Sequence, residues 1–282
     1  MIAGTEAGAA VDNDTCHSVI LGYRAAKAWC DGSGHRGSVY IGNEVGCAQH
    51  TGNYNVYVGD KVGKTQTSGS SNTYIGRQIA DEGANTGSYN IYIGEEIASA
   101  SSNTTGQYNL SIGYYSHYQA TSAAMNIAIG LWAGHNVTTG GCNLFLGKDA
   151  GKGDSTNYVT GNNNTIVGAV NAGLKITSGT YNALFGTSAG RCLTSGSSNT
   201  FIGHNSGGGG TTTGNDNVAV GRNAGNKITS GANNVFLGSC AGCFSATGNC
   251  NIAIGAGVTF TACKGSGQLA IGVGATHWKD GE

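Results

Sequence analysis

The sequence contains no proline and few charged residues. Only 10% of its 282 residues are Asp, Glu, Lys or Arg, against a usual share of about 25%. The formal net charge is −1, so the chain lacks the basic surface that attracts nucleic acid or an anionic membrane. No apolar run approaches the ~18 residues of a membrane span. We therefore expect no nucleic-acid partner and no membrane insertion.

Glycine is abundant instead, and it is regularly spaced. The chain has 51 glycines, and sixteen of them end a short apolar triplet that is usually led by asparagine. Of the fifteen spacings between these anchor glycines, eight are 17 residues and four are 18. A fixed period near 20 residues indicates a solenoid rather than a disordered linker. The anchor glycines are Gly4, Gly22, Gly42, Gly59, Gly76, Gly94, Gly113, Gly130, Gly147, Gly168, Gly186, Gly203, Gly221, Gly238, Gly255 and Gly272.

Each repeat predicts short strands separated by turns. The residue before the anchor glycine is Ile, Val, Leu or Phe from Leu21 to Ile271, and the third residue before it is mostly aliphatic. Because side chains alternate along a strand, we expect both positions to face the core. Turns of the form Gly-x-x-Ala-Gly and Thr-Ser-Gly follow. We predict an all-β fold: a parallel β-solenoid, in the form of a left-handed β-roll of about 16 coils with a 17–18-residue repeat. Residues 1–276 would form a single domain and residues 277–282 a C-terminal tail.

An asparagine stands four residues before the anchor glycine in twelve repeats. Stacked coils lie ~4.8 Å apart, a spacing at which side-chain amides can form a hydrogen-bonded ladder. We therefore interpret these asparagines as structural. Backbone pairing between all coils also explains the absence of proline, which has no N–H to donate. The ladder residues are Asn55, Asn72, Asn90, Asn109, Asn126, Asn143, Asn164, Asn182, Asn199, Asn217, Asn234 and Asn251.

The position two residues before the anchor glycine is apolar as well. Alternation predicts that it points away from the core of its own coil. Strands that are apolar on both faces are buried on both faces, and other copies of the chain are the simplest cover. We therefore predict an oligomer whose axis runs along the solenoid. The largest side chains of this predicted oligomer face are Tyr40, Tyr57, Tyr74, Tyr92, Phe145, Phe201 and Phe236.

The repeat N-x-x-I-G-x-x-A-G…T-S-G resembles the repeat regions of bacteriophage tail fibres and is similar to the head repeats of trimeric autotransporter adhesins. The resemblance covers roughly residues 1–276. It implies a homotrimer of parallel β-rolls in a virion fibre or at a cell surface, with a role in attachment to a host surface. Two features depart from the pattern: the period is mostly 17 here, longer than in typical adhesin heads, and the chain contains no C-terminal chaperone domain.

No constellation of catalytic or metal-binding residues stands out. Cys240 and Cys243 form a CxxC near Cys250, but no second pair or well-placed histidine accompanies them, so buried thiols compete with a zinc site as the interpretation. The pairs 81–82 and 95–96 are acidic and lie on turns, without an insertion that could build a glycosidase cleft. We expect no catalytic residues, no metal and no cofactor.

Aromatic side chains interrupt the polar turns in two successive repeats. The two positions after the anchor glycine are mostly polar, but they are Tyr114 and Tyr115 in one repeat and Leu131 and Trp132 in the next, with His135 nearby. Adjacent exposed rings are typical of recognition sites. The rings either pack on a neighbouring subunit or bind a cell-surface glycan or receptor. The candidate binding residues are Tyr114, Tyr115, His117, Tyr118 and Trp132.

The sequence thus favours a structural or adhesive fibre segment. A filament of chains stacked end to end is the main alternative. An ice-binding solenoid is a minor one, because the threonines lie mostly in corners rather than on a flat face.

Overall fold

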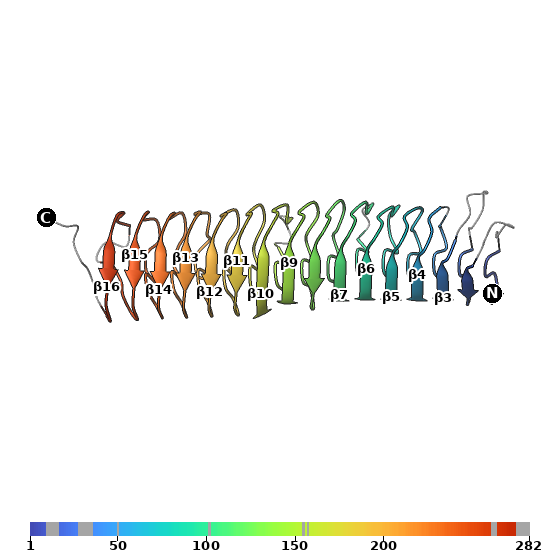
Figure 1. Ribbon diagram of the computed structural model, residues 1–282, viewed down its shortest axis with the longest axis horizontal. Helices are drawn as coiled ribbons and strands as arrows, with labels where there is room; N and C mark the ends of the chain where they lie inside the picture. Colours follow the sequence, from blue (N-terminus) through green and yellow to red (C-terminus); the bar gives the residue numbers. More distant parts are fainter. Residues whose placement is uncertain are drawn as a thin grey trace. The chain divides into compact units, whose positions relative to one another are not determined.

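The computed structural model describes residues 1–9, 17–27, 36–49, 51–100, 103–153, 156, 158–260 and 264–274. These residues form sixteen short strands and no helix, and one anchor glycine lies in the second half of each strand or just beyond its end (Figure 1). The fold is therefore the expected all-β parallel solenoid. The chain divides into two compact units, Met1–Gly140 and Gly141–Glu282. The prediction of a single domain over residues 1–276 stays a prediction, and its tail at 277–282 lies outside the described residues.

Within each unit, every strand pairs in parallel with the strand of the next coil. None of the described residues forms a helix long and apolar enough to cross a membrane. The first unit contains β1 (Ile2–Ala3), β2 (Val19–Leu21), β3 (Val39–Asn43), β4 (Val56–Asp60), β5 (Thr73–Arg77), β6 (Ile91–Glu95), β7 (Leu110–Tyr114) and β8 (Ile127–Ile129). The second unit contains β9 (Leu144–Lys148), β10 (Thr165–Val170), β11 (Ala183–Phe185), β12 (Thr200–Ile202), β13 (Val218–Val220), β14 (Val235–Leu237), β15 (Ile252–Ile254) and β16 (Leu269–Ile271).

The anchor glycines are required by the close approach of neighbouring coils. Gly59 has a φ of 141°, which side-chain-bearing residues rarely adopt. A Cβ atom at Gly59 would lie 1.8 Å from the carbonyl oxygen of Gly76 in the next coil. The same approach recurs from coil to coil, so the repeating glycine reflects both the backbone angle and the close contact between neighbouring coils of the chain.

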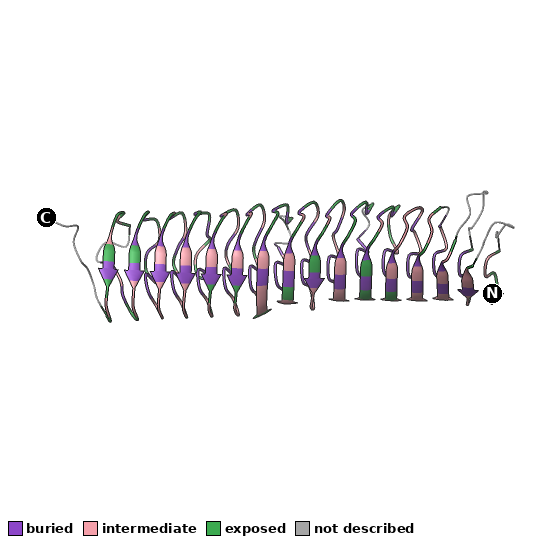
Figure 2. Ribbon diagram, in the orientation of Figure 1, coloured by how far each residue is buried: buried purple, intermediate pink, exposed green. Residues whose placement is uncertain are grey.

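The core lies on the opposite strand face from the one expected. Tyr40, Tyr57, Tyr74, Tyr92, Phe145, Phe201 and Phe236 are almost completely buried within the single chain. The prediction that these rings form the oligomer face is therefore wrong: they fill the interior of the coils. In Figure 2 the middle residue of each three-residue strand is buried, whereas its neighbours are intermediate or exposed. The residues directly before the anchor glycine, expected in the core, point outward.

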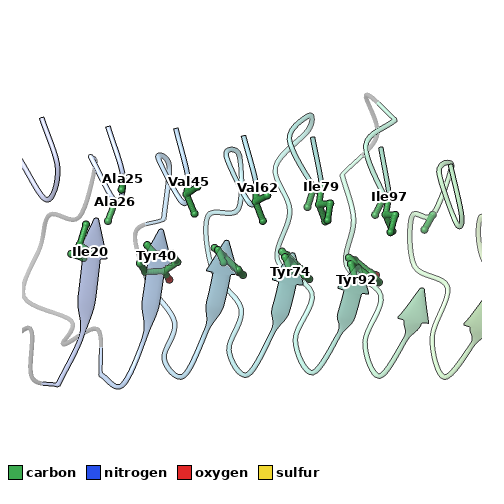
Figure 3. Packing of buried hydrophobic residues seen from close by; sticks show 14 residues of the cluster. Ile20, Ala25, Ala26, Tyr40, Val45, Val62, Tyr74, Ile79, Tyr92 and Ile97 are labelled. Atoms are coloured by element: carbon green, nitrogen blue, oxygen red, sulfur yellow. The ribbon is translucent and has the colours of Figure 1, made fainter. Parts of the chain in front are cut away.

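In the first unit the interior rings pack against aliphatic side chains from the turn across the coil. Tyr40 and Tyr74 lie opposite Val45, Val62 and Ile79 (Figure 3). Successive rings also stack: the centroids of Tyr57 and Tyr74 are 4.8 Å apart and their planes differ by 5°. The stacking follows from the register, because strand pairing places equivalent positions of neighbouring coils side by side.

The predicted asparagines form a ladder inside the solenoid. In each unit, Oδ1 of one asparagine accepts a hydrogen bond from the backbone N–H of the asparagine one coil further on. Examples are the Asn72 N–H to Asn55 Oδ1 bond (2.9 Å) and the Asn199 N–H to Asn182 Oδ1 bond (2.9 Å). The Nδ2 group of Asn182 donates to the carbonyl oxygen of Gly196 (2.9 Å), a corner residue. The buried amides therefore hold the strand and the corner together.

Replacing Asn182 by leucine should lower the free energy of unfolding by several kcal/mol. The change removes the acceptor of the Asn199 N–H and both donors of Nδ2, and each buried polar group left unpaired costs roughly 1–3 kcal/mol. Urea denaturation followed by circular dichroism measures the effect. Asn162→Leu is the control, because Asn162 is exposed and its side chain accepts a single hydrogen bond, from the backbone N–H of Gly141, among the described residues. Equal midpoints for the two variants would contradict a structural role for the ladder.

One coil of the first unit exchanges the positions of large and small interior side chains. In several coils an interior ring faces a glycine four residues beyond the anchor: a Cβ at Gly207 would lie 2.4 Å from the Phe201 ring. In the coil of Gly113 the ring position holds Ser111, and the position facing it holds His117. The Ser111 hydroxyl and His117 Nδ1 are 2.8 Å apart. The imidazole therefore fills the space that a ring occupies elsewhere.

This exchange predicts strong coupling between the two positions. Ser111→Phe alone should overpack the coil by about 1–3 kcal/mol, and His117→Gly alone should leave a cavity and an unpaired hydroxyl. The double variant reproduces the combination of Phe201 and Gly207. Its free energy of unfolding should therefore exceed the value expected from adding the two single effects by about 1–3 kcal/mol. Urea unfolding of all four proteins completes the cycle. Additive effects would show that the two side chains do not share one space.

Candidate functional site

Four ring side chains gather where β7 and the turns of two successive coils meet in the first unit, and Trp132 occupies the turn position equivalent to Tyr115 one coil further on. We call Tyr114, Tyr115, Tyr118, Trp132 and His135 the aromatic patch. The Tyr115 ring meets Tyr114 edge-on at 4.3 Å between centroids and Tyr118 at 4.8 Å. The Tyr118 ring stacks on His135 at 5.3 Å with 22° between the planes. Tyr114 is 41% exposed, so the cluster reaches the surface.

The backbone places these rings in unusual conformations. Tyr115 and Trp132 occupy equivalent turn positions, with φ values of 56° and 58°. Their N–H groups donate to the carbonyl oxygens of Glu95 (3.0 Å) and Tyr114 (3.0 Å), each one coil earlier. Bulky residues rarely adopt this left-handed conformation, which glycine, asparagine and aspartate tolerate best. The two rings are therefore held at positions that the fold alone would fill better with small polar residues.

Carboxylates adjoin the aromatic patch. A hydrogen bond from the Tyr115 phenol to the Glu96 side chain is the main cause that raises the pKa of Tyr115. Burial, and then the charges of Glu96, Glu82 and Asp81, raise the pKa of Tyr118. Both phenols therefore keep their protons at neutral pH. The patch combines apolar ring faces, neutral hydroxyl groups and a negative border.

His117 does not belong to the aromatic patch, and its prediction as a binding residue is wrong. Its side chain points into the coil and is fully buried beside Ser111. Burial lowers the pKa of His117 to about 4, because the interior disfavours the charged imidazolium. The neighbouring histidine that does join the rings is His135, on the next coil.

The buried imidazole makes stability depend on pH. The pKa of His117 is about 4 in the folded chain and ~6.5 in an unfolded one, so only the unfolded chain binds the proton between these values. Its contribution to stability is complete above pH ~6.5 and is lost as the pH falls to about 4, at up to ~1.4 kcal/mol per pH unit. Urea unfolding of wild type and His117→Gln from pH 4 to 7 should show this slope only in wild type. His204→Gln, at an exposed histidine, is the control and should keep it.

A second pair of stacked rings lies at the corners of the first unit. Tyr89 and Tyr108 are exposed, and their ring centroids are 4.9 Å apart with nearly parallel planes. Both precede a ladder asparagine and have φ values near 60°. Sequence analysis missed them. Several repeats place a small polar residue at this position, such as Ser71 and Ser198, whereas Tyr54, Met125 and Tyr181 occupy it in others.

The outward positions of the strands form a continuous apolar surface in each unit, which we call the outer face. It consists of the residues one and three before each anchor glycine, and none of these residues is charged. Ile75 and Ile93, paired on β5 and β6, are 39% and 36% exposed. In the first unit the outer face comprises Val19, Leu21, Val39, Ile41, Val56, Val58, Thr73, Ile75, Ile91, Ile93, Leu110, Ile112, Ile127 and Ile129. In the second unit it comprises Leu144, Leu146, Thr165, Val167, Ala183, Phe185, Thr200, Ile202, Val218, Val220, Val235, Leu237, Ile252, Ile254, Leu269 and Ile271.

Polar and charged residues follow the anchor glycines along the turns. Arg77 pairs with Glu95 one coil further on, and Asn43 Nδ2 donates to Asp60 Oδ1 (2.5 Å). Arg24 bridges Glu6 and Glu44 on its two neighbouring coils. These groups are partly exposed, so each pair contributes little stability. The Arg77 contact also occupies Glu95, one of the carboxylates considered for catalysis.

Six cysteines lie among the described residues, and all are free thiols. Burial raises the pKa of Cys47 to about 11, which keeps that thiol protonated and unreactive. Within the described part of the chain, no group of three or more His, Cys, Asp or Glu side chains is placed to hold a metal ion. Cys16, Cys30 and Cys263 lie outside that part.

Comparison of the chain with protein-family models, with curated proteins and with solved structures finds no match. Of the features that the resemblance to fibre repeats implies, the structure shows the parallel β-solenoid and its short repeat.

Proposed function

We propose that the chain is a structural fibre segment that associates side by side with other copies of itself through the outer face. The outer face carries this proposal, because it presents aliphatic side chains in nearly every coil of both units. Parallel sheets are ordinarily covered on both faces. A large exposed apolar surface on a soluble chain marks an interaction site.

The extent of the outer face suits a stable interface. Of the fourteen residues in the first unit, Ile75, Ile91, Ile93 and Ile127 are exposed and the other ten are partly exposed, so the open area is on the order of several hundred Å². Each partner in an interface of standard size buries ~800 Å².

The repeat favours a second copy of the chain as the partner. Equivalent residues of the outer face are one strand spacing apart in successive coils. A partner that contacts these residues along a whole unit therefore needs the same spacing. A further copy has that spacing by construction. Three copies, as the resemblance to tail-fibre and adhesin repeats implies, would enclose the outer faces around a common axis.

In this proposal the assembled fibre belongs to a virion or to the outside of a cell and serves attachment, without enzymatic activity. End-to-end stacking into filaments is the alternative arrangement of the same chain. Electron microscopy separates the two, because side-by-side oligomers have a fixed length and filaments do not.

Charging the outer face should abolish association. Ile75→Lys combined with Ile93→Glu places opposite charges on adjacent strands, so the isolated chain gains no like-charge repulsion. Light scattering should give an oligomer for wild type and a folded monomer for the variant. The control is Thr86→Lys with Thr105→Glu, at exposed corner residues of two successive coils, which should stay oligomeric. A monomeric wild type at high concentration, or an oligomeric variant, would contradict the proposal.

A further inference from the structure

We propose that the aromatic patch is a carbohydrate-binding site that prefers neutral or amino sugars over acidic ones. The patch lies within the first unit of one chain, so this proposal does not depend on self-association. It assigns a ligand to a region where two successive coils carry aromatic rings at turn positions that are mostly polar elsewhere.

The patch is local, which distinguishes it from a contact between copies. A side-by-side contact between solenoids of equal period recurs in every coil, as the outer face does. The position of Tyr115 and Trp132 is instead polar in most other coils, as at Gln78, Asn205 and Asn223. A departure confined to two coils fits a ligand of limited size.

The rings are also held against the preference of the backbone. Tyr115 and Trp132 adopt positive φ at a position that asparagine occupies with less strain elsewhere in the chain, as at Asn205. The interior of the second coil does not require them, since Ala128, Ala133 and Val137 are its buried apolar residues.

The chemistry of the patch matches a pyranose ring. The C–H groups of a sugar face pack on an open aromatic ring, and Tyr114 offers one at the surface. The sugar hydroxyls need both donors and acceptors, which the neutral phenols and the Glu96 carboxylate provide. A few polar groups placed around apolar rings are typical of small-ligand sites.

The charges near the patch set its selectivity. The carboxylates of Asp81, Glu82 and Glu96 all act on Tyr118, so the patch lies in a negative field. A sialic or uronic acid would enter this field with a like charge, which weakens binding. A neutral hexose escapes the repulsion, and an amino sugar with a free ammonium group gains attraction.

The test is a glycan array carrying matched neutral, amino and acidic saccharides, probed with the full chain. Wild type should bind neutral or amino sugars. Tyr115→Asn with Trp132→Asn places a residue suited to positive φ at both positions, and binding should fall at least tenfold while the melting temperature is kept or rises. The matched control is Tyr54→Asn with Tyr181→Asn, two exposed tyrosines with φ near 60° outside the patch, which should bind as wild type does.

A second variant tests the selectivity. Glu96→Gln keeps the shape of the side chain but removes a negative charge, so the ratio of acidic to neutral sugar binding should rise several-fold. The proposal is overturned if wild type binds no sugar, if it prefers acidic sugars, or if the double asparagine variant binds fully. A double variant that loses its oligomeric mass together with binding would assign the patch to a subunit contact instead. The separate light-scattering result for the outer-face variant distinguishes that outcome from a failure of the self-association proposal.

Discussion

Within each unit, the structure depends on parallel pairing of each coil with its neighbouring coils. In-register pairing brings every position of the repeat next to the same position of the neighbouring coil, one strand spacing away. Each position must therefore hold a residue type that packs well against itself. Asparagines pair with asparagines, rings stack on rings and glycines approach glycine carbonyls because of this one constraint. The absence of proline follows from it too, since every coil donates backbone hydrogen bonds.

Periodicity in the sequence was sufficient to predict the parallel solenoid, since glycine spacing and the asparagine position report directly on the repeat. Hydrophobicity could not show which face of each strand points into the solenoid, because both faces are apolar. The asparagines held the missing information: Asn55 and Tyr57 are two residues apart, so a buried amide ladder requires the ring to be buried on the same face. Polar satisfaction was a better guide to the inside than apolar character.

The candidate site shows a similar division. Tyr114, Tyr115 and Trp132 were recognisable because they break a polar pattern. His117 was assigned to the surface because it follows them in sequence, yet it lies inside. His117 can lie inside because Ser111, on the other side of the interior, is small and leaves room for the imidazole. This exchange of a large and a small side chain can be recognised only once the three-dimensional positions of both residues are known. The proximity of the carboxylates to the aromatic patch likewise depends on the three-dimensional structure.

The interior tyrosines of the first unit have an optical consequence. Tyr57, Tyr74 and Tyr92 form a stack with centroids 4.8–4.9 Å apart and planes within 6° of parallel. At this separation the electronic transitions of neighbouring phenols couple, and absorbed energy passes between rings. The buried ring positions of the second unit hold phenylalanine and aliphatic residues instead. Near-ultraviolet circular dichroism and tyrosine fluorescence anisotropy thus carry a signal from the interior of the first unit that the interior of the second unit lacks. The melting of the first unit can therefore be followed without an added label.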